Sequence, residues 1–372
     1  MKKNNTWIIA IILIVVGFVI FTRTSDTENK IIKIGVIEPL TGGASAYGEV
    51  AKNGFALAID EINAAGGIDG KQVEVIYEDT KCTGKDALSS VQKLIDMDKV
   101  QYMVGGMCSS EVLGVLPVTE AKKMIFLGQG SSPDITGKGK FFFRTWPSDD
   151  LSGKFLVDAL VPQYKKIAII SEKTDYATAL AKTFSDHALT KGAEIVASET
   201  FVSDVKDFRP QLSKIKAQNP EVLFINPQTG QNGAIIAKQA RELGINAQFV
   251  TFFFTGDEFV KSGPAVNGSI VLDVPSLDTN RSISVAYFNA YKTKYNSVNY
   301  PFVGAQMYDY AYLLKQAIEK NGHDADKIAA YLRELSEYKG VIGDFSFADT
   351  GDVENIGFTL RKVENNQLVD IK

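Results

Sequence analysis

The sequence predicts an α/β protein with two lobes, each built on a doubly wound parallel sheet with helices on both faces. From residue 31 onward, short β-branched runs alternate with amphipathic stretches of helical length, which is typical of parallel strands joined by crossover helices. This rhythm runs twice along the chain. With 372 residues, 45% of them hydrophobic and 23% charged, the chain is long enough for two globular domains.

The first series of strands falls in the N-terminal third of the chain. Helical stretches separate these strands, and in residues 50–63 the apolar side chains recur at helical spacing. Because the strands are continuously apolar, we expect sheets that are covered on both faces. The expected strands are 31–37, 73–77, 100–105 and 124–128.

The second series begins after residue 147. Its expected strands are 166–171, 194–201, 221–226 and 248–254, and its expected helices are 177–191, 208–218 and 230–243. A strand at 270–275 is then followed by helical stretches with no strand between them, at 282–295, 303–320 and 324–337. This break indicates that the chain returns to the first lobe. The last part, 339–372, is strand-like again.

The first thirty residues have the layout of an export signal. Lys2 and Lys3 precede the apolar run 7–21, and a polar stretch, 22–30, follows. No Ala-x-Ala pattern or early cysteine marks a cleavage or lipid-anchor site, so a cleaved signal and a retained membrane anchor both stay open, and we favour retention. About fifteen apolar residues span about 23 Å, which is short for a bilayer core. The lysines place the rest of the chain outside.

The chain has two cysteines, Cys82 and Cys108. In an exported protein such a pair favours one disulfide, and two buried free thiols are the alternative. Without nearby histidines the pair offers too few ligands for a metal site.

Other function classes find little support. The net charge of -4 and the absence of a basic run argue against nucleic acid as a partner. The only histidines, His187 and His323, lie in helical stretches without a catalytic motif around them, so we expect neither an enzyme nor a cofactor. A ligand-sensing module of a receptor stays open as an alternative.

Several segments occur in the order and spacing of one known family. They include "IGVIEPLTGGASAYGE", "AIDEINAAGGIDGKQVEVIYEDTKC", "VGGMCSSE", "GQGSSPDIT", "FRTWPSD", "DYATALA" and "MYDYAYLLKQAI". Over residues 31–372 the chain resembles the branched-chain-amino-acid-binding family of type I periplasmic binding proteins. The resemblance implies a solute-binding protein that captures an amino acid or related carboxylate for an ABC permease.

The resemblance also implies how the lobes are connected. It predicts two lobes joined by a three-strand hinge, with crossings near residues 144–148, 273–278 and 338–343. The expected division is a signal or anchor at 1–30, a first lobe of 31–146 plus 277–339, and a second lobe of 147–276 plus 340–372. In doubly wound lobes ligands lie at the carboxyl ends of the strands, so the cleft between the lobes is the expected site.

Three residues resemble the family's contacts to the ligand backbone. Ser109 follows a strand at the start of a predicted helix and matches the carboxylate-binding serine; the alternative is a plain N-cap. Ser131 matches a second hydroxyl contact. Gln129 occupies the position whose backbone carbonyl would accept a hydrogen bond from a ligand amine.

Four further residues match wall positions of the family's cleft. They are Tyr47, Tyr176, Tyr308 and Gln228. Each tyrosine has ordinary packing as its alternative, and Gln228 is polar where relatives commonly carry an aromatic residue.

The segment "QFVTFFFTGDEF" departs from the family pattern. Amino-acid binders usually carry an acid here that pairs with the ligand ammonium, and Phe253 takes that position in this chain. Either Asp257 or Glu258 substitutes for it, or the ligand has no amine and is an apolar or aromatic carboxylate. Both acids also fit the description of ordinary loop residues. Glu38, after the first strand, is a weaker substitute.

Overall fold

The structure, a computed structural model, describes residues 31–252, 256–296 and 299–371. Its first sheet has the strand order β2-β1-β3-β4-β5, and all neighbouring strands run parallel. The five carboxyl ends therefore meet at one edge of the sheet. The strands are β1 (Ile31–Glu38), β2 (Gln72–Asp79), β3 (Tyr102–Gly105), β4 (Phe126–Gly128) and β5 (Phe142–Arg144).

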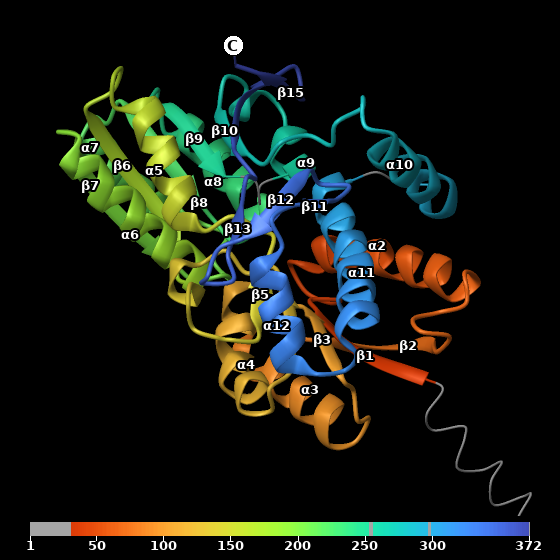
Figure 1. Cartoon of the computed structure of the whole chain (residues 1–372). Helices are drawn as coiled ribbons and strands as arrows, with labels where there is room; N and C mark the ends of the chain where they lie inside the picture. Colours follow the sequence, from red (N-terminus) through yellow and green to blue (C-terminus); the bar gives the residue numbers. More distant parts are fainter. Residues whose placement is uncertain (1–30, 253–255, 297–298, 372) are drawn as a thin grey trace, which may run out of the picture.

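The second sheet has the order β15-β14-β10-β9-β8-β6-β7. Strands β6 to β10 run parallel, while β14 and β15 are antiparallel. The predicted α/β fold with two parallel-sheet lobes is thus confirmed (Figure 1). The strands are β6 (Lys166–Glu172), β7 (Glu194–Phe201), β8 (Val222–Asn226), β9 (Gln248–Phe252), β10 (Ile270–Asp273), β14 (Thr359–Glu364) and β15 (Gln367–Asp370).

Helices cover both faces of the first sheet. Helices α2 (Ser45–Ala64) and α11 (Pro301–Asn321) pack on one face, and α3 (Gly84–Asp96) and α4 (Ser109–Ala121) pack on the other. A Cβ atom added to Gly54 would lie 2.0 Å from the carbonyl oxygen of Gly304, so the close crossing of α2 and α11 requires glycine. Helices α10 (Ser282–Tyr295) and α12 (Ala325–Glu334), which precede and follow α11 in the chain, also lie near α11 in the structure (Figure 1).

Helices also cover the second sheet. They are α5 (Asp149–Leu160), α6 (Asp175–Thr190), α7 (Arg209–Ala217), α8 (Gly230–Glu242) and α9 (Gly256–Val260). The strand expected at 248–254 is β9, which ends at Phe252; residues 253–254 lie outside the described residues. Strand β5 was not predicted, because three residues give too short a pattern.

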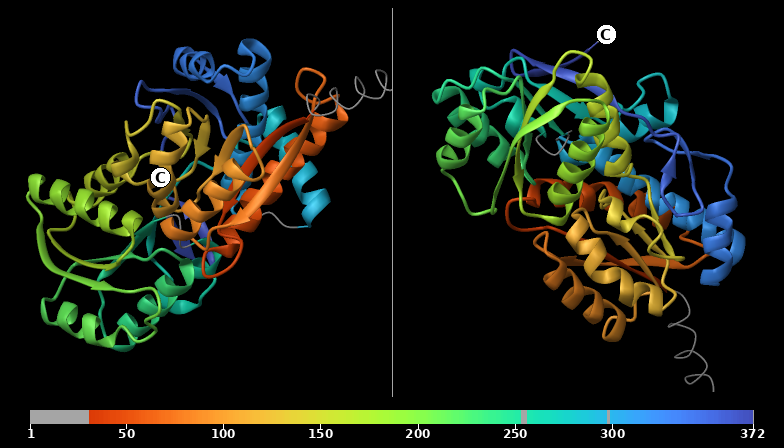
Figure 2. Two further views of the ribbon diagram at one scale, coloured as in Figure 1. Left: turned by 90° about the horizontal axis from the view of Figure 1, so that it is seen from below. Right: turned by 90° about the vertical axis from the view of Figure 1, so that its left-hand side faces the viewer.

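A small antiparallel sheet lies where the chain passes between the lobes. Its strands are β11 (Tyr338–Lys339), β12 (Asp344–Phe347) and β13 (Val353–Glu354). A single bridge between Arg144 and Asp352 links it to the end of β5. Only β14 and β15 continue into the second sheet, where the chain ends (Figure 2). The sequence patterns did not separate this small sheet from the rest of the C-terminal segment.

Side chains of helix α11 bind two of the chain segments that connect the two large sheets. The hydroxyl oxygen of Tyr310 accepts a hydrogen bond from the backbone N–H of Thr145 at 2.9 Å. The carboxylate of Asp309 accepts hydrogen bonds from the backbone N–H groups of Val341 and Ile342 at 2.8 and 3.0 Å. The chain is therefore anchored on the same helix where it leaves β5 and where it leaves α12.

The predicted export signal, residues 1–30, lies outside the described residues. Among the helices of the described segments, none is both long and apolar enough to span a bilayer.

Cys82 and Cys108 form a disulfide between the loop after β2 and the loop after β3, with a Cα–Cα distance of 5.4 Å. The predicted pairing is confirmed. The bond links two strand ends at the edge of the sheet that carries Ser109.

Replacing both cysteines by serine should lower the free energy of unfolding by about 3.5 kcal/mol, because the bond closes a loop across 26 positions of sequence and restricts the unfolded chain. Urea titration of the wild-type and Cys82→Ser/Cys108→Ser proteins measures the difference. Full alkylation of both thiols in unreduced, unfolded wild-type protein would contradict the assignment of a disulfide.

Candidate ligand-binding site

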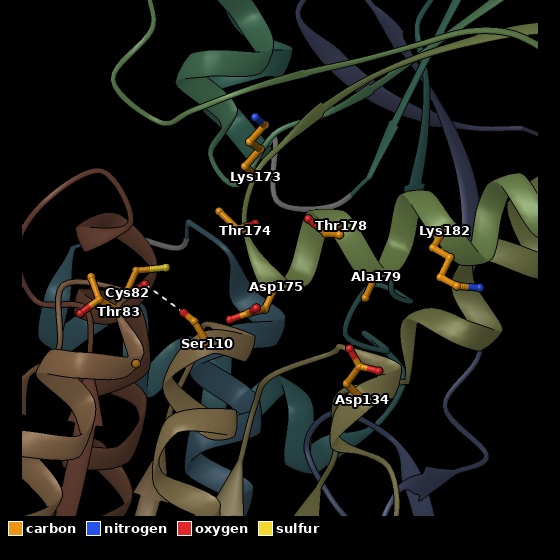
Figure 3. Close-up of a pocket in the computed structure, with 11 residues that line it drawn as sticks. Cys82, Thr83, Ser110, Asp134, Lys173, Thr174, Asp175, Thr178, Ala179 and Lys182 are labelled. Carbon is orange, nitrogen blue, oxygen red and sulfur yellow. Dashed lines mark hydrogen bonds between the residues drawn. The ribbon is translucent and has the colours of Figure 1, made fainter.

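A cavity of about 470 Å³ opens between the two lobes (Figure 3). One wall comes from the first lobe and includes Ser110, and the other comes from the start of α6 and includes Asp175. These two residues are sequence neighbours of Ser109 and Tyr176, so the cavity adjoins the predicted site. Its lining consists of Cys82, Thr83, Gly84, Ser110, Asp134, Lys173, Thr174, Asp175, Thr178, Ala179 and Lys182.

Ser109 is the first residue of α4 and is buried. Cys108 occupies the N-cap position, so Ser109 is not the helix cap. Its hydroxyl oxygen accepts a hydrogen bond from the backbone N–H of Ser132 at 3.0 Å. A hydroxyl that accepts one bond keeps its own proton for another partner. Ser109 can therefore donate to a ligand oxygen beside a helix N-terminus, where negative charge is favoured.

Ser131 and Gln129 lie in the loop after β4. The hydroxyl of Ser131 donates to Oδ2 of Asp149 at 2.7 Å, and the backbone N–H of Asp149 donates to the Ser131 carbonyl at 2.8 Å. Because Asp149 begins α5, this pair of bonds ties the loop to the second lobe. Gln129 donates from Nε2 to Oε1 of Gln306 at 3.0 Å. Its own Oε1 is buried and has no partner among the described residues.

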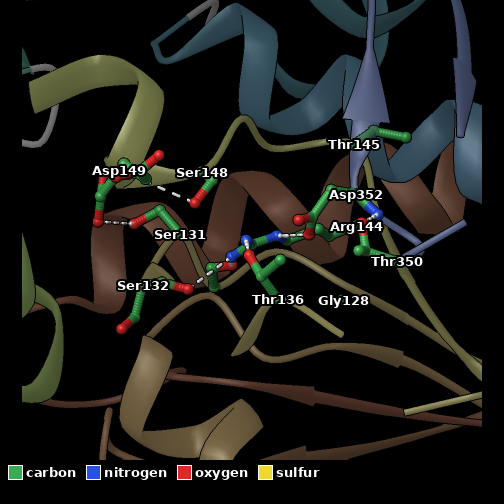
Figure 4. A network of polar contacts seen from close by, with 12 residues as sticks. Gly128, Ser131, Ser132, Thr136, Arg144, Thr145, Ser148, Asp149, Thr350 and Asp352 are labelled. Atoms are coloured by element: carbon green, nitrogen blue, oxygen red, sulfur yellow. Dashed lines mark hydrogen bonds and ion pairs between the residues drawn. The ribbon is translucent and has the colours of Figure 1, made fainter. Parts of the chain in front are cut away.

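The loop that carries Ser131 is held by the buried side chain of Arg144 (Figure 4). Nη1 donates to the carbonyls of Gly130 and Ser132 at 2.8 and 2.9 Å, and Nε lies 2.6 Å from Oδ1 of Asp352. Arg144 lies in the segment "FRTWPSD", and no feature of that segment predicts this role of the arginine. Its partner Asp352 follows 208 residues later, and no local pattern links the two.

Tyr47 stands in the first turn of α2 and is buried against Tyr300, with 4.6 Å between the ring centroids. Burial, and then the neighbouring Tyr300, Glu258 and Tyr176, raise the pKa of Tyr47 well above its usual value. Glu258 and Tyr176 belong to the second lobe, so Tyr47 faces that lobe across the cleft. Tyr300 was not predicted, since it precedes α11 outside any motif.

Tyr176 and Gln228 lie together in the second lobe. Tyr176 is in the first turn of α6, and burial, followed by Asp149 and Glu172, raises its pKa well above the usual value. The backbone N–H of Gln228 donates to Oε2 of Glu172 at 2.8 Å. Glu172, at the end of β6, therefore lies beside both predicted wall residues, although sequence analysis did not single it out.

Tyr308 lies apart from the other predicted site residues. Its hydroxyl donates to Glu61 of α2, and its ring contacts those of Tyr287 and Tyr312. Residues two positions apart on a helix point about 200° apart. Gln306, on another side of α11, reaches the loop after β4 through its bond to Gln129.

The acids expected to replace the ammonium partner are only partly described. Phe253 lies outside the described residues, as does the side chain of Asp257. Glu258 is an exposed residue of α9 whose charge acts on Tyr47. It is therefore near the cleft.

Comparisons with known proteins show the family of the chain. A family profile described as "Periplasmic binding protein" matches residues 31–365. The leucine-, isoleucine-, valine-, threonine- and alanine-binding protein of Pseudomonas aeruginosa is 27% identical over 353 residues, covering 93% of this chain and 92% of that protein. The Leu/Ile/Val-binding protein BraC3 of Rhizobium johnstonii is 29% identical, covering 91% and 93%.

Solved structures share the fold. The branched-chain amino acid substrate-binding protein LivJ of Streptococcus pneumoniae, in complex with isoleucine, has a TM-score of 0.80 and 28% identity, covering 91% of this chain and 98% of that one. A solute-binding protein from Rhodopseudomonas palustris, in complex with 3,4-dihydroxybenzoic acid, has a TM-score of 0.79 and 23% identity, covering 92% and 96%. The family resemblance seen in the sequence is confirmed.

Asp149→Asn should flatten the dependence of stability on pH. Burial raises the pKa of Asp149 to about 7, against the lowering effect of Ser131, Arg144 and Ser152. The folded state therefore binds the proton more tightly than the unfolded state, and this stability is lost as the pH rises from about 4 to about 7. Between pH 5.5 and 7.5 the group accounts for roughly 2 kcal/mol.

Urea titrations of ligand-free wild-type and variant protein at both pH values measure this contribution. Asn keeps the shape, and both serine hydroxyls can rotate to suit it. An unchanged difference between the two pH values in the variant would show that Asp149 is not the group responsible.

Proposed function

The chain belongs to the periplasmic binding protein family, and we propose that it captures a small carboxylate, an amino acid or a related acid, for an ABC importer. The family is one of solute-binding proteins, not of enzymes, and its members act outside the cytoplasm. We extend this to the chain itself: it binds its ligand without turning it over, and its partner is a membrane permease.

The observation that carries the carboxylate assignment is the pairing of Ser109 with the loop of Ser131. Ser109 sits at the N-terminus of α4 and also accepts from Ser132, so one hydrogen bond joins the two loops that carry the serines. The hydroxyl proton of Ser109 and the helix N–H groups then converge on one edge of the first sheet. The Ser131 hydroxyl joins them when Asp149, whose pKa burial raises to about 7, is protonated and donates to Ser131. Such a set of donors suits an oxyanion.

The mechanism we propose is closure of two lobes on the ligand. The first lobe comprises residues 31–146 and 277–339, and the second comprises 147–276 and 340–372. Tyr47 of the first lobe is close enough to Tyr176 and Glu258 of the second lobe for both to raise its pKa, so we expect a ligand in the cleft to contact the two tyrosines. Binding then shifts an open–closed equilibrium toward the closed form that the permease recognises.

The names of the relatives support a ligand of about the size of an amino acid. The Pseudomonas aeruginosa protein is named for small amino acids, and the Streptococcus pneumoniae structure holds isoleucine. The Rhodopseudomonas palustris structure, of similar fold, holds an aromatic acid without an amine. Both classes share a carboxylate, which is the part of the ligand that Ser109 and Ser131 address.

We assign residues 1–30 as the export signal, retained as a membrane anchor.

Binding should make the protein more compact. Small-angle scattering on the folded chain, with and without a ligand found by a thermal-shift screen of amino acids and simple carboxylates, should show a smaller radius of gyration in the complex. Identical scattering profiles would exclude closure as the response to ligand.

Ser109→Ala should weaken carboxylate binding by roughly 10- to 100-fold, because a hydrogen bond to a charged group is lost. Calorimetric titration of leucine and of 4-methylpentanoate, which lacks its amine, measures the effect for both ligand classes. Ser89→Ala, an exposed change on α3, serves as the control. Equal affinities in wild-type and Ser109→Ala would contradict the assignment of Ser109 to the carboxylate.

A further inference from the structure

Glu38 is the last residue of β1, and its side chain is fully buried. Neither carboxylate oxygen has a hydrogen-bond partner among the residues that the structure describes. Burial, and then the nearby carboxylate of Glu111, raise the pKa of Glu38 well above its usual value. A buried carboxyl group that makes no hydrogen bond destabilises a fold, so Glu38 lacks a partner that the described residues do not supply.

Glu38 lies at the same edge as the candidate site. The carbonyl of Ile37 accepts a hydrogen bond from the N–H of Gly106 at 2.7 Å, and the carbonyl of Gly106 accepts from the N–H of Gly130 at 3.1 Å. This row of backbone bonds continues past the ends of β1, β3 and β4. It connects Glu38 to the two loops that carry Ser109 and Ser131.

The Glu38 carboxylate turns toward β3, the strand that leads to Ser109. A Cβ atom added to Gly105 would lie 2.8 Å from Oε1 of Glu38. Gly105 also has a φ of 104°, a backbone conformation that favours glycine. Glycine at this position therefore leaves the space that the carboxylate occupies.

A second buried acceptor lies on the other side of β3. Oε1 of Gln129, directly after β4, also has no partner among the described residues. Glu38 and Gln129 thus present unused acceptors from the strands on either side of β3. The oxygens of an ionised Glu38 and of the Gln129 amide accept hydrogen bonds, so a donor group on a ligand satisfies both.

We propose that Glu38 accepts a hydrogen bond from an ammonium or hydroxyl group at the end of the ligand remote from its carboxylate. The proposal rests on the proposed function, which assigns the carboxylate end to Ser109 and Ser131. Neighbouring strands are about 4.8 Å apart, so Glu38 lies roughly 5 to 10 Å from the two serine loops. An α-ammonium is closer than this to its own carboxylate, whereas a donor on the ligand tail fits the spacing.

The test is a calorimetric comparison of three ligands of equal length: hexanoate, 6-hydroxyhexanoate and 6-aminohexanoate. The wild-type chain should bind at least one of the two donor-bearing acids at least tenfold more tightly than hexanoate. The hydroxyl and amino probes distinguish the two possible donors. In Glu38→Gln this preference should fall at least tenfold, while hexanoate affinity stays unchanged.

Glu74→Gln is the matched control, since it makes the same change at an exposed position of β2 in the same lobe. Glu38→Gln should also be at least as stable as wild-type without ligand at pH 7.5, because the change removes a buried acid that has no partner. A loss of stability would point to a structural role and overturn the proposal.

A preference that persists in Glu38→Gln, or equal binding of all three probes by the wild type, would likewise overturn the proposal while leaving the carboxylate site intact. Failure of every carboxylate to bind, including leucine and 4-methylpentanoate, would overturn the proposed function and the Glu38 assignment with it.

Discussion

The buried guanidinium of Arg144 fixes the geometry on which the candidate site depends. It holds the carbonyls of Gly130 and Ser132 and pairs with Asp352 of the small third sheet. A buried cation is costly unless its donors are paired, so a half-formed version of this arrangement is unfavourable. The loop that carries Ser131 is therefore fixed by side-chain bonds as well as by its flanking strand, and we expect a ligand to meet a preformed surface in the first lobe.

The same constraint limits where the lobes can bend. Thr145, the neighbour of Arg144, is bonded to Tyr310, and Asp309 holds the N–H groups of Val341 and Ile342. Two passages between the lobes thus stay fixed to α11. On the second-lobe side, Asp273 pairs with Arg361 at 2.6 Å. Under the proposed closure we expect bending in the short stretches between these anchors, with little distortion of the site loops.

The sequence predicted the fold and the strand-end loops well, because a repeated β-α rhythm is a local pattern. It also identified the disulfide. It could not predict contacts that depend on helix phase or on distant partners. Tyr308 lies in a matching motif but points away from the site, and Arg144 meets Asp352 only through the topology of the small sheet. The sequence offered Glu38 as a weak candidate, because burial and the lack of a partner become visible only in three dimensions.

The charges of the buried residues limit what the cleft accepts. Within the described residues, Arg144 is the only buried lysine or arginine, and Asp352 neutralises it. Buried acids are more numerous: Glu38, Glu111, Asp149, Glu172, Asp273 and Asp309. Among the buried groups a ligand carboxylate would therefore meet hydroxyls and a helix N-terminus, while the lysines that line the cavity, Lys173 and Lys182, are exposed. Buried dipoles compensate one negative charge far better than two, so under the proposed function we expect a ligand whose tail is neutral or positive rather than one with a second acid.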